Sequence, residues 1–193
     1  MSGLKEMDLE ELWRLFPIVL REHDPAWAEW FTDEQLRLAQ LWGADAARIS
    51  HVGSTAVPGL VAKPTVDILL ELDESVVPQE VVDRTRNAGW LLMSGEAVRP
   101  LRLSFNKGYT PAGFAERVFH LHVRPSGDWD QLYFRDYLRE NADVAAQYAE
   151  LKRSLAAEHE RDRDAYTAAK GDFVREATAR ARAAFGGRYA PKS

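Results

Sequence analysis

Apolar residues recur with helical spacing in the first part of the chain. They follow one face of residues 8–16, which predicts a short helix that Pro17 ends. Asp24 followed by Pro25 has the residue types of a helix start, and helical spacing continues well beyond them. We therefore expect residues 24–43 to form one bent helix or a helical hairpin.

Shorter apolar runs, bounded by glycine, proline and polar residues, predict strands in the middle of the chain. The most apolar run covers residues 65–72 and has the character of a buried strand, apart from Asp67 near its start. A helix over residues 78–88, ended by Gly89, would follow it. The other predicted extended segments are residues 18–20, 48–52, 90–93, 101–106 and 117–124, with Gly108, Pro111 and Gly113 in a loop between the last two.

Helix-forming residues dominate the last third of the chain. We expect one helix over residues 128–139 and a helical region from about residue 143 to residue 185, ahead of two glycines. A helical start, a sheet with crossover helices and a helical end together predict an α+β fold. In this fold helices flank a mixed β-sheet, and a helical segment closes the chain.

Length and composition narrow the functional classes. The 193 residues predict one domain, and a hydrophobic share of 46% is typical of globular proteins. The chain has no cysteine, which excludes disulfides, zinc–thiolate sites and cysteine nucleophiles. A net charge of −5 without a long basic run argues against nucleic acid as a partner. With no apolar stretch near ~18 residues and no secretory leader pattern, we expect a cytoplasmic protein without a membrane partner.

The turn at Gly53, Ser54 and Thr55 is the first candidate for chemistry. A glycine after a strand lets backbone N–H groups approach an anion closely, and the serine adds a hydroxyl donor, although an ordinary loop has the same pattern. Lys63 and Asp67 follow at the next strand, and a cation and a carboxylate beside such a turn suit a metal–nucleotide site. The alternative is an ion pair of Asp67 with Lys63 or an arginine, which would compensate its burial.

His120 and His122 are the second candidate. They lie on one face of a predicted strand, about 7 Å apart, which is close enough to bind one metal ion or to flank one phosphate. A hydrogen-bonded sheet face without a ligand explains the pair equally well. Lys107, Arg117 and Arg124 lie near them in the sequence and make this region cationic, which suits an anionic ligand.

Other charged residues have simpler interpretations. Arg135 and Arg139 are four residues apart on a predicted helix, and a solvated charged face is the usual explanation for such a pair. Glu71 is about 13 Å from Asp67 along the strand, too far to share a metal ion, and we expect it at the rim or in solvent. Lys152 and Lys170 are predicted to be ordinary surface residues of later helices.

Four segments of the chain resemble the GrpB family in their order and spacing. They are residues 51–68 (HVGSTAVPGLVAKPTVDI), 120–123 (HLHV), 134–139 (FRDYLR) and 148–152 (YAELK). The resemblance extends over about residues 17–173 and implies that residues 1–193 form one nucleotidyltransferase-like domain of the DNA polymerase beta type. Relatives of this family also occur fused to dephospho-coenzyme A kinase, but the chain has no Gly-x-x-x-x-Gly-Lys-Ser/Thr loop of its own.

The resemblance also implies roles for individual residues. In the superfamily the Gly-Ser turn holds nucleotide phosphates, and an Asp-x-Asp or Asp-x-Glu pair binds two magnesium ions. By this analogy Asp67 is the first carboxylate, whereas the second position holds the apolar Leu69. The resemblance thus places Gly53 and Ser54 at the phosphate turn. Our leading hypothesis adds Thr55 as a phosphate ligand, His122 beside Asp67 as a metal ligand, and Lys63, His120 and Arg135 as further catalytic residues.

Three functional hypotheses follow. In the first, the chain binds a nucleoside triphosphate with magnesium and transfers a nucleotidyl or related group to an unknown small acceptor. In the second, it is a noncatalytic module that binds a nucleotide or another phosphorylated ligand, because Leu69 leaves the two-metal site incomplete. In the third, the histidines and arginines form a buried structural network without a ligand.

Overall fold

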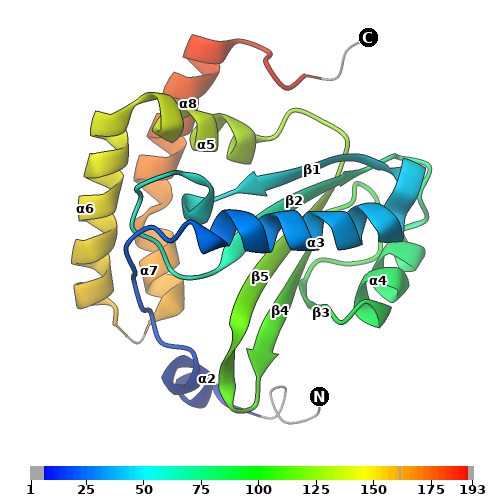
Figure 1. Ribbon diagram of the computed structural model, residues 1–193, viewed down its shortest axis with the longest axis horizontal. Coiled ribbons are helices and arrows are strands. Elements are labelled where there is room, and N and C mark those ends of the chain that lie inside the picture. Colours follow the sequence, from blue (N-terminus) through cyan, green and yellow to red (C-terminus); the bar gives the residue numbers. More distant parts are fainter. Residues whose placement is uncertain (1–6, 161, 191–193) are drawn as a thin grey trace.

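A five-stranded mixed sheet organises the protein, of which this computed structural model describes residues 7–160 and 162–190 (Figure 1). The strand order is β1-β2-β5-β4-β3, and all neighbours are antiparallel except the central pair β2 and β5. The strands are β1 (Ala46–Val52), β2 (Val66–Leu72), β3 (Leu91–Ser94), β4 (Leu103–Thr110) and β5 (Gly113–Pro125). Because β2 and β5 run parallel in register, Asp67 lies opposite His120, and Leu69 lies opposite His122.

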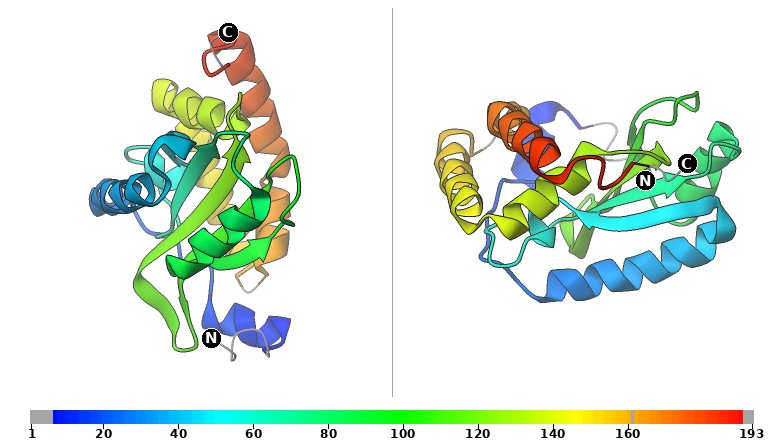
Figure 2. Two further views of the ribbon diagram at one scale, coloured as in Figure 1. Left: turned by 90° about the vertical axis from the view of Figure 1, so that its right-hand side faces the viewer. Right: turned by 90° about the horizontal axis from the view of Figure 1, so that it is seen from above.

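One face of the sheet is covered by α3 (Ala26–Trp42) and α4 (Pro78–Asn87) (Figure 2). Side chains alternate along a strand, so one set of β2 residues points to this face. Ile68 and Leu70 of that set are fully buried in the main core, which also contains Trp27 and Trp42 of α3. The other set, which includes Asp67, therefore points to the opposite face.

The opposite face carries the C-terminal helices α5 (Asp130–Glu140), α6 (Ala142–Glu158), α7 (Arg163–Ala169) and α8 (Gly171–Phe185). Leu132 of α5 packs on Val52 and Leu69 of the sheet. A second apolar cluster joins α5, α6 and α8 to the loop over residues 57–61. The short helix α2 (Leu9–Leu15) lies at the tip of the β4–β5 hairpin. The sheet edge at β1 and β2 thus faces a helical layer contributed by the end of the chain.

The predicted fold class, a mixed sheet flanked by helices, is confirmed. Several local predictions need correction. Residues 24–43 contain one helix that ends at Gly43, and the region from 143 to 185 is three helices. Residues 18–20 form no strand, although Arg21 pairs with Ala62 in an isolated bridge. Gly108 lies inside β4, at a register irregularity, because the hairpin turns only at residues 110–113.

Glu71 is not at the rim as expected. Its side chain is fully buried, and its carboxylate accepts hydrogen bonds from Arg48 and from the backbone N–H of Gly127. The pattern of the strand predicts the face on which Glu71 lies. It does not predict that Arg48 and the loop before α5 surround the carboxylate on that face. None of the helices described is long and apolar enough to cross a membrane.

Candidate functional site

A hollow of about 270 Å³ lies where the turn after β1 and the start of β2 meet the helical layer. We call it the lysine hollow, because Lys63, Lys152 and Lys170 reach it from a loop, from α6 and from the junction of α7 and α8. It brings together six of the predicted site residues that are far apart in the sequence. The residues lining it are Gly53, Ser54, Thr55, Lys63, Thr65, Asp67, His120, Phe134, Tyr148, Lys152, Tyr166, Thr167 and Lys170.

The turn is fixed by contacts on both sides. Gly53 has φ 71° and ψ −170°, and a Cβ atom there would lie 2.4 Å from Oδ2 of Asp67. Only glycine adopts this backbone region readily, so it allows the turn to lie directly on the carboxylate. The Thr55 hydroxyl donates to the carbonyl oxygen of Thr65 and lies 3.0 Å from Nε2 of His51. The Thr55 side chain therefore holds the turn against β2.

His51 also holds the turn, through its contact with the Thr55 hydroxyl. Its side chain stacks on Phe31, and burial lowers the pKa of His51 to about 4. The imidazole is therefore neutral at pH 7. Because the Thr55 hydroxyl already donates its proton to Thr65, a proton on Nε2 of His51 completes the contact between the two side chains.

Asp67 contacts both predicted histidines. Its Oδ1 lies 3.1 Å from Nδ1 of His120 and 3.5 Å from Nε2 of His122. Burial raises the pKa of Asp67, but the hydrogen bonds from the two histidines outweigh burial and hold this pKa well below its usual range. Within the described ranges, the ion-pair contacts of Asp67 are to the histidines and not to Lys63 or an arginine.

Lys152 and Lys170 are the part of the site that the sequence pattern misassigned, whereas Lys63 was a candidate from the sequence and does line the hollow. Lys152 is 2% exposed, and its Nζ donates to Ser54 Oγ at 3.1 Å and to the carbonyl oxygen of Val61. The prediction that Lys152 is a surface residue is therefore wrong. It occupies the buried face of α6 with Tyr148 and Leu155, and this helical spacing was the signal in the sequence that marks it as internal.

Burial lowers the pKa of all three amines, to about 8 for Lys63 and to about 7 for Lys152 and Lys170. Neighbouring cations add to this effect, because each amine lies among other positive charges. The charge of Asp67 opposes this effect at Lys63 and Lys170. Aromatic rings are close neighbours: the Nζ of Lys170 is 4.0 Å from the ring centroid of Tyr166, and that of Lys152 is 4.7 Å from that of Tyr148. Among the described residues, no Asp or Glu forms an ion pair with any of the three.

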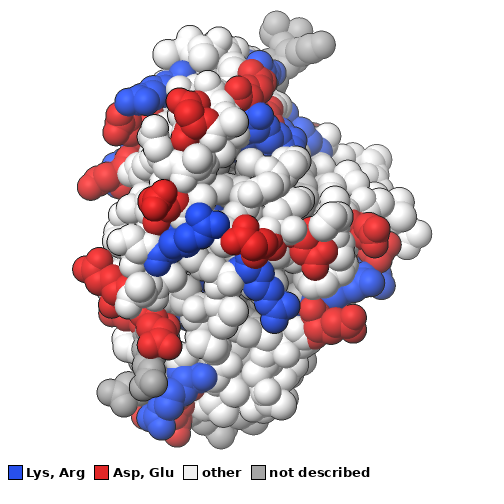
Figure 3. Space-filling model, turned by 60° about the vertical axis from the view of Figure 1, so that its left-hand side comes forward, with Lys and Arg blue, Asp and Glu red and all other residues white. Residues whose placement is uncertain are grey.

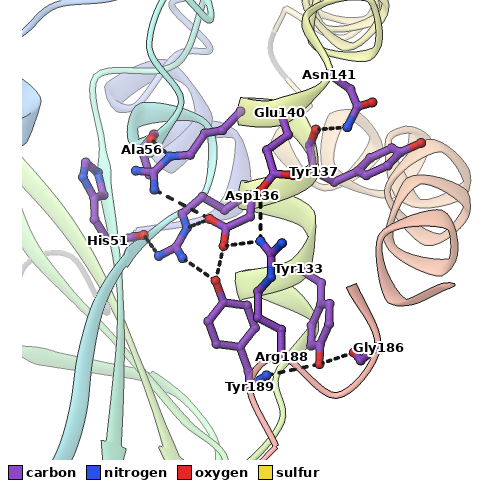
Figure 4. A network of polar contacts seen from close by, with 12 residues as sticks. His51, Ala56, Tyr133, Asp136, Tyr137, Glu140, Asn141, Gly186, Arg188 and Tyr189 are labelled. Atoms are coloured by element: carbon purple, nitrogen blue, oxygen red, sulfur yellow. Dashed lines mark hydrogen bonds and ion pairs between the residues drawn. The ribbon is translucent and has the colours of Figure 1, made fainter. Parts of the chain in front are cut away.

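Arg135 lies elsewhere than our leading hypothesis expects, and it belongs to a network of polar contacts around Asp136 (Figure 4). Its NH1 donates to the carbonyl oxygen of His51 at 3.0 Å, while Nε of Arg139 donates to that of Ala56 at 2.8 Å. The two arginines of α5 thus hold the backbone on either side of the Gly53 turn. Oδ1 of Asp136 accepts from Nε of Arg135 at 2.7 Å and balances the charge. The Arg135 side chain is 13% exposed and that of Arg139 is 39% exposed, so only Arg139 retains part of the expected solvated face. Both arginines support the turn, and Arg135 does not line the lysine hollow.

A two-magnesium site does not fit these residues. Leu69, at the second carboxylate position, is fully buried against Val52 and Leu132, so water and ions do not reach it. Among the described residues Asp67 is the one carboxylate that lines the hollow, and Mg²⁺ prefers oxygen ligands to imidazole. In the part of the chain that the structure describes, no group of three or more His, Cys, Asp or Glu side chains is arranged to hold a metal ion.

Fold and site together define an α+β protein with a cationic hollow at one edge of a mixed sheet, under a C-terminal helical layer. Residues 17–180 match the family model described as GrpB protein, so the chain belongs to the GrpB family. It is 30% identical to the conserved protein GrpB from Enterococcus faecalis, whose crystal structure superposes with a TM-score of 0.74 over 86% of this chain and 99% of that one.

Three curated relatives also match most of this chain. The chain is 41% identical to a UPF0157 protein from Pseudomonas aeruginosa, over 83% of this chain and 66% of that protein. It is 33% identical to UPF0157 protein YqkA from Bacillus subtilis, over 80% of this chain and 44% of that protein. A dephospho-CoA kinase from Mycolicibacterium paratuberculosis matches with 30% identity over 86% of this chain and 46% of its own length. The chain thus spans only about half to two thirds of these relatives.

Proposed function

We propose that the lysine hollow binds the phosphates of a nucleoside triphosphate. The observation that carries this proposal is the gathering of three lysines around the Gly53 turn, where among the described residues none of the three forms an ion pair and Asp67 is the nearby carboxylate. Buried cations without partners are costly, and a polyphosphate would compensate all three at once. A volume of about 270 Å³ is small against the ~300–1,000 Å³ of typical ligand pockets, so it suits the phosphates and not the whole nucleotide.

Nucleotidyl transfer is the second candidate function, favoured by the position of Asp67. Its Oδ2 lies directly under the Gly53 turn, which is where the superfamily resemblance expects the first carboxylate. In this proposal a nucleotidyl or related group passes to a small acceptor, and Asp67 is the carboxylate in the hollow near any Mg²⁺ that the triphosphate carries with it. Leu69 favours the simpler alternative of a noncatalytic binding module.

The proposed partners are small molecules. On the face drawn in Figure 3, acidic and basic side chains alternate, and no extended basic surface covers it. A nucleic acid needs many adjacent cations to replace its counterions, so this face is unsuited to one. The cytoplasmic location stays a prediction from the sequence.

Ligand-dependent stability tests the proposed binding. Tripolyphosphate or ATP, each with and without magnesium, should raise the free energy of unfolding of the wild type by about 2.7 kcal/mol at 100 times its dissociation constant. Lys170→Gln should weaken this effect strongly, because it removes one of the three cations in the hollow. Arg180→Gln makes the same change of charge on the exposed face of α8 and should bind like the wild type. If neither ligand stabilises the wild type, the proposed function is wrong.

A second measurement separates transfer from binding. An enzyme would release pyrophosphate from ATP when small hydroxyl compounds are supplied as acceptors, and Asp67→Asn should abolish that release. Tight binding of ATP without pyrophosphate release from any acceptor favours the binding module. Release that persists unchanged in Asp67→Asn would contradict the role proposed for Asp67.

Binding of a polyphosphate should depend on pH. In the free protein, Lys152 and Lys170 lose their protons near pH 7 and Lys63 near pH 8, whereas a bound anion favours their charged forms. The terminal phosphate of ATP, with a second pKa of about 6, is already ionised within this range. The affinity for ATP should therefore fall as pH rises from about 7.5 to 9.5, with uptake of protons on binding.

Calorimetric titrations in buffers of different ionisation enthalpy measure this proton uptake. Lys170→Arg keeps its charge throughout the range and should show a shallower loss of affinity than the wild type. An affinity that stays constant across the range in the wild type would show that the lysines do not contact the phosphates.

A further inference from the structure

A second and larger hollow adjoins the lysine hollow. Its volume is about 460 Å³, and the two share Lys63, His120 and Thr167 at their boundary. It lies between α2, the strands β3 to β5 and α7, beside the β4–β5 hairpin. We call it the aromatic hollow. Its size falls within the range of pockets that hold an organic ligand, whereas an inorganic anion would leave most of it empty.

The walls of the aromatic hollow are mostly apolar. Trp13 and Phe16 line it from the N-terminal segment, and Leu92 and Met93 line it from β3. Met93 is 53% exposed and forms part of the rim. Apolar walls with a few fixed polar groups are the usual composition of a site for a ring-bearing small molecule.

The polar groups of this hollow are held by a chain of hydrogen bonds that begins in the lysine hollow. Asp67 accepts from Nδ1 of His120 at 3.1 Å. The Tyr109 hydroxyl lies 2.8 Å from Nε2 of the same imidazole, and its oxygen accepts from Arg163 at 3.1 Å. This series of hydrogen bonds thus fixes the phenol of Tyr109 and the guanidinium of Arg163 at the boundary of the two hollows.

Arg163 gives the aromatic hollow a flat cationic surface. Its guanidinium carbon lies 5.7 Å from the ring centroid of Tyr109 and 5.9 Å from that of Phe114. Among the described residues it forms no ion pair with an Asp or Glu side chain. A planar guanidinium without an acidic partner can stack on a heteroaromatic ring or bind its carbonyl oxygens.

We propose that the two hollows form one site for a nucleotide, with the phosphates in the lysine hollow and the base and sugar in the aromatic hollow. This proposal rests on the proposed function for its phosphate half and adds the position of the base. Lys63 and His120, which border both hollows, then lie near the bond between sugar and phosphate. The polar edge formed by Asn106, Tyr109 and Arg163 faces the base.

Comparison of ATP with tripolyphosphate tests the base half separately. Calorimetric titration should show that the wild type binds ATP at least about tenfold more tightly than tripolyphosphate. Met93→Ala should weaken ATP about threefold to tenfold and leave tripolyphosphate within about twofold of its wild-type affinity. Tyr109→Phe should do the same, because it removes a polar contact and keeps the ring. Val98→Ala changes another exposed apolar residue, at 55% exposure, outside both hollows, and should alter neither affinity.

The possible outcomes distinguish this proposal from the function on which it rests. If tripolyphosphate binds and ATP gains nothing over it, the base does not occupy the aromatic hollow, while the phosphate site stands. If Met93→Ala and Tyr109→Phe weaken both ligands equally, they act on the phosphate half and the proposal is also wrong. If neither ligand binds the wild type, the proposed function itself fails. Thermal unfolding of each variant verifies that it is folded.

Discussion

Gly53→Ala should destabilise the protein by about 3–5 kcal/mol, a large part of the 5–15 kcal/mol that holds a typical domain together. Two effects add. A backbone with φ 71° and ψ −170° costs an alanine about 1–3 kcal/mol, and the new Cβ would lie 2.4 Å from Oδ2 of Asp67. To relieve this contact the turn must move away from β2. The variant should therefore also lose the binding of tripolyphosphate.

Gly59→Ala is the matched control. Gly59 also has a positive φ, of 74°, but a Cβ atom there would meet no atom within 4 Å. This variant should carry only the backbone cost, about 1–2 kcal/mol, and keep its affinity for tripolyphosphate. Urea unfolding and calorimetric titration measure both quantities. Equal losses of stability in the two variants would mean that the close approach of the turn to Asp67 is not essential.

Arg48→Ala should destabilise the protein by about 3 kcal/mol, because it leaves the carboxylate of Glu71 buried without its cation. Arg48 donates to Glu71 through two nitrogen atoms and also to the carbonyl oxygen of Gly127. The Glu71 side chain is 0% exposed, whereas that of Arg48 is 32% exposed, so water screens the arginine only in part. We therefore expect an effect at the lower end of the range for buried pairs.

Arg180→Ala provides the comparison for this pair. Arg180 pairs with Glu176 on α8, where both side chains are more than half exposed, at 58% and 66%. Removal of this arginine should change stability by less than about 0.5 kcal/mol, as is usual for exposed pairs. Urea unfolding of both variants tests the contrast. A loss in Arg48→Ala no larger than that in Arg180→Ala would show that Glu71 finds another partner or is hydrated.

The pair at Arg48 and Glu71 lies at the far end of the same strand face that carries Asp67. Leu69, packed under Leu132, separates the two carboxylates of β2. The carboxylate of Glu71 thus forms a structural ion pair, and that of Asp67 lines the lysine hollow. The two variants should therefore distinguish the roles of the two carboxylates. Arg48→Ala should reduce stability and keep the affinity for tripolyphosphate, whereas Gly53→Ala should reduce both.

Much of the fold could be predicted from local patterns. The apolar run with Asp67 near its start is β2, and the spacing that ends at Gly89 is α4. Predictions failed where distant contacts decide the outcome. Gly108 suggested a loop, but it lies in β4, where an added Cβ would be 2.3 Å from the carbonyl oxygen of Arg117 on the neighbouring strand. That requirement for glycine depends on strand pairing, which spacing within one segment does not show.

The candidate site could be predicted only in part, for the same reason. The approach of Asp67 to His120 follows from two parallel neighbouring strands, and the sequence had already singled out both residues. The role of Lys170 could not be obtained this way, and for Lys152 the helical spacing with Tyr148 and Leu155 indicates burial but not the partner of its amine. A lysine on a helix is usually solvated, and only the packing of that helix against the turn encloses the amine.

The sequence by itself determined most of the elements and the residue types at the turn, because periodicity and the freedom of glycine act over a few neighbouring residues. It also indicated the family through motifs that are continuous in the chain. The tertiary structure decided which charges share a hollow. Lys63, Lys152 and Lys170 come from three separate elements, and their burial and lowered pKa values arise only when the helical layer closes over the turn. Such effects depend on distances in space, which no local pattern encodes.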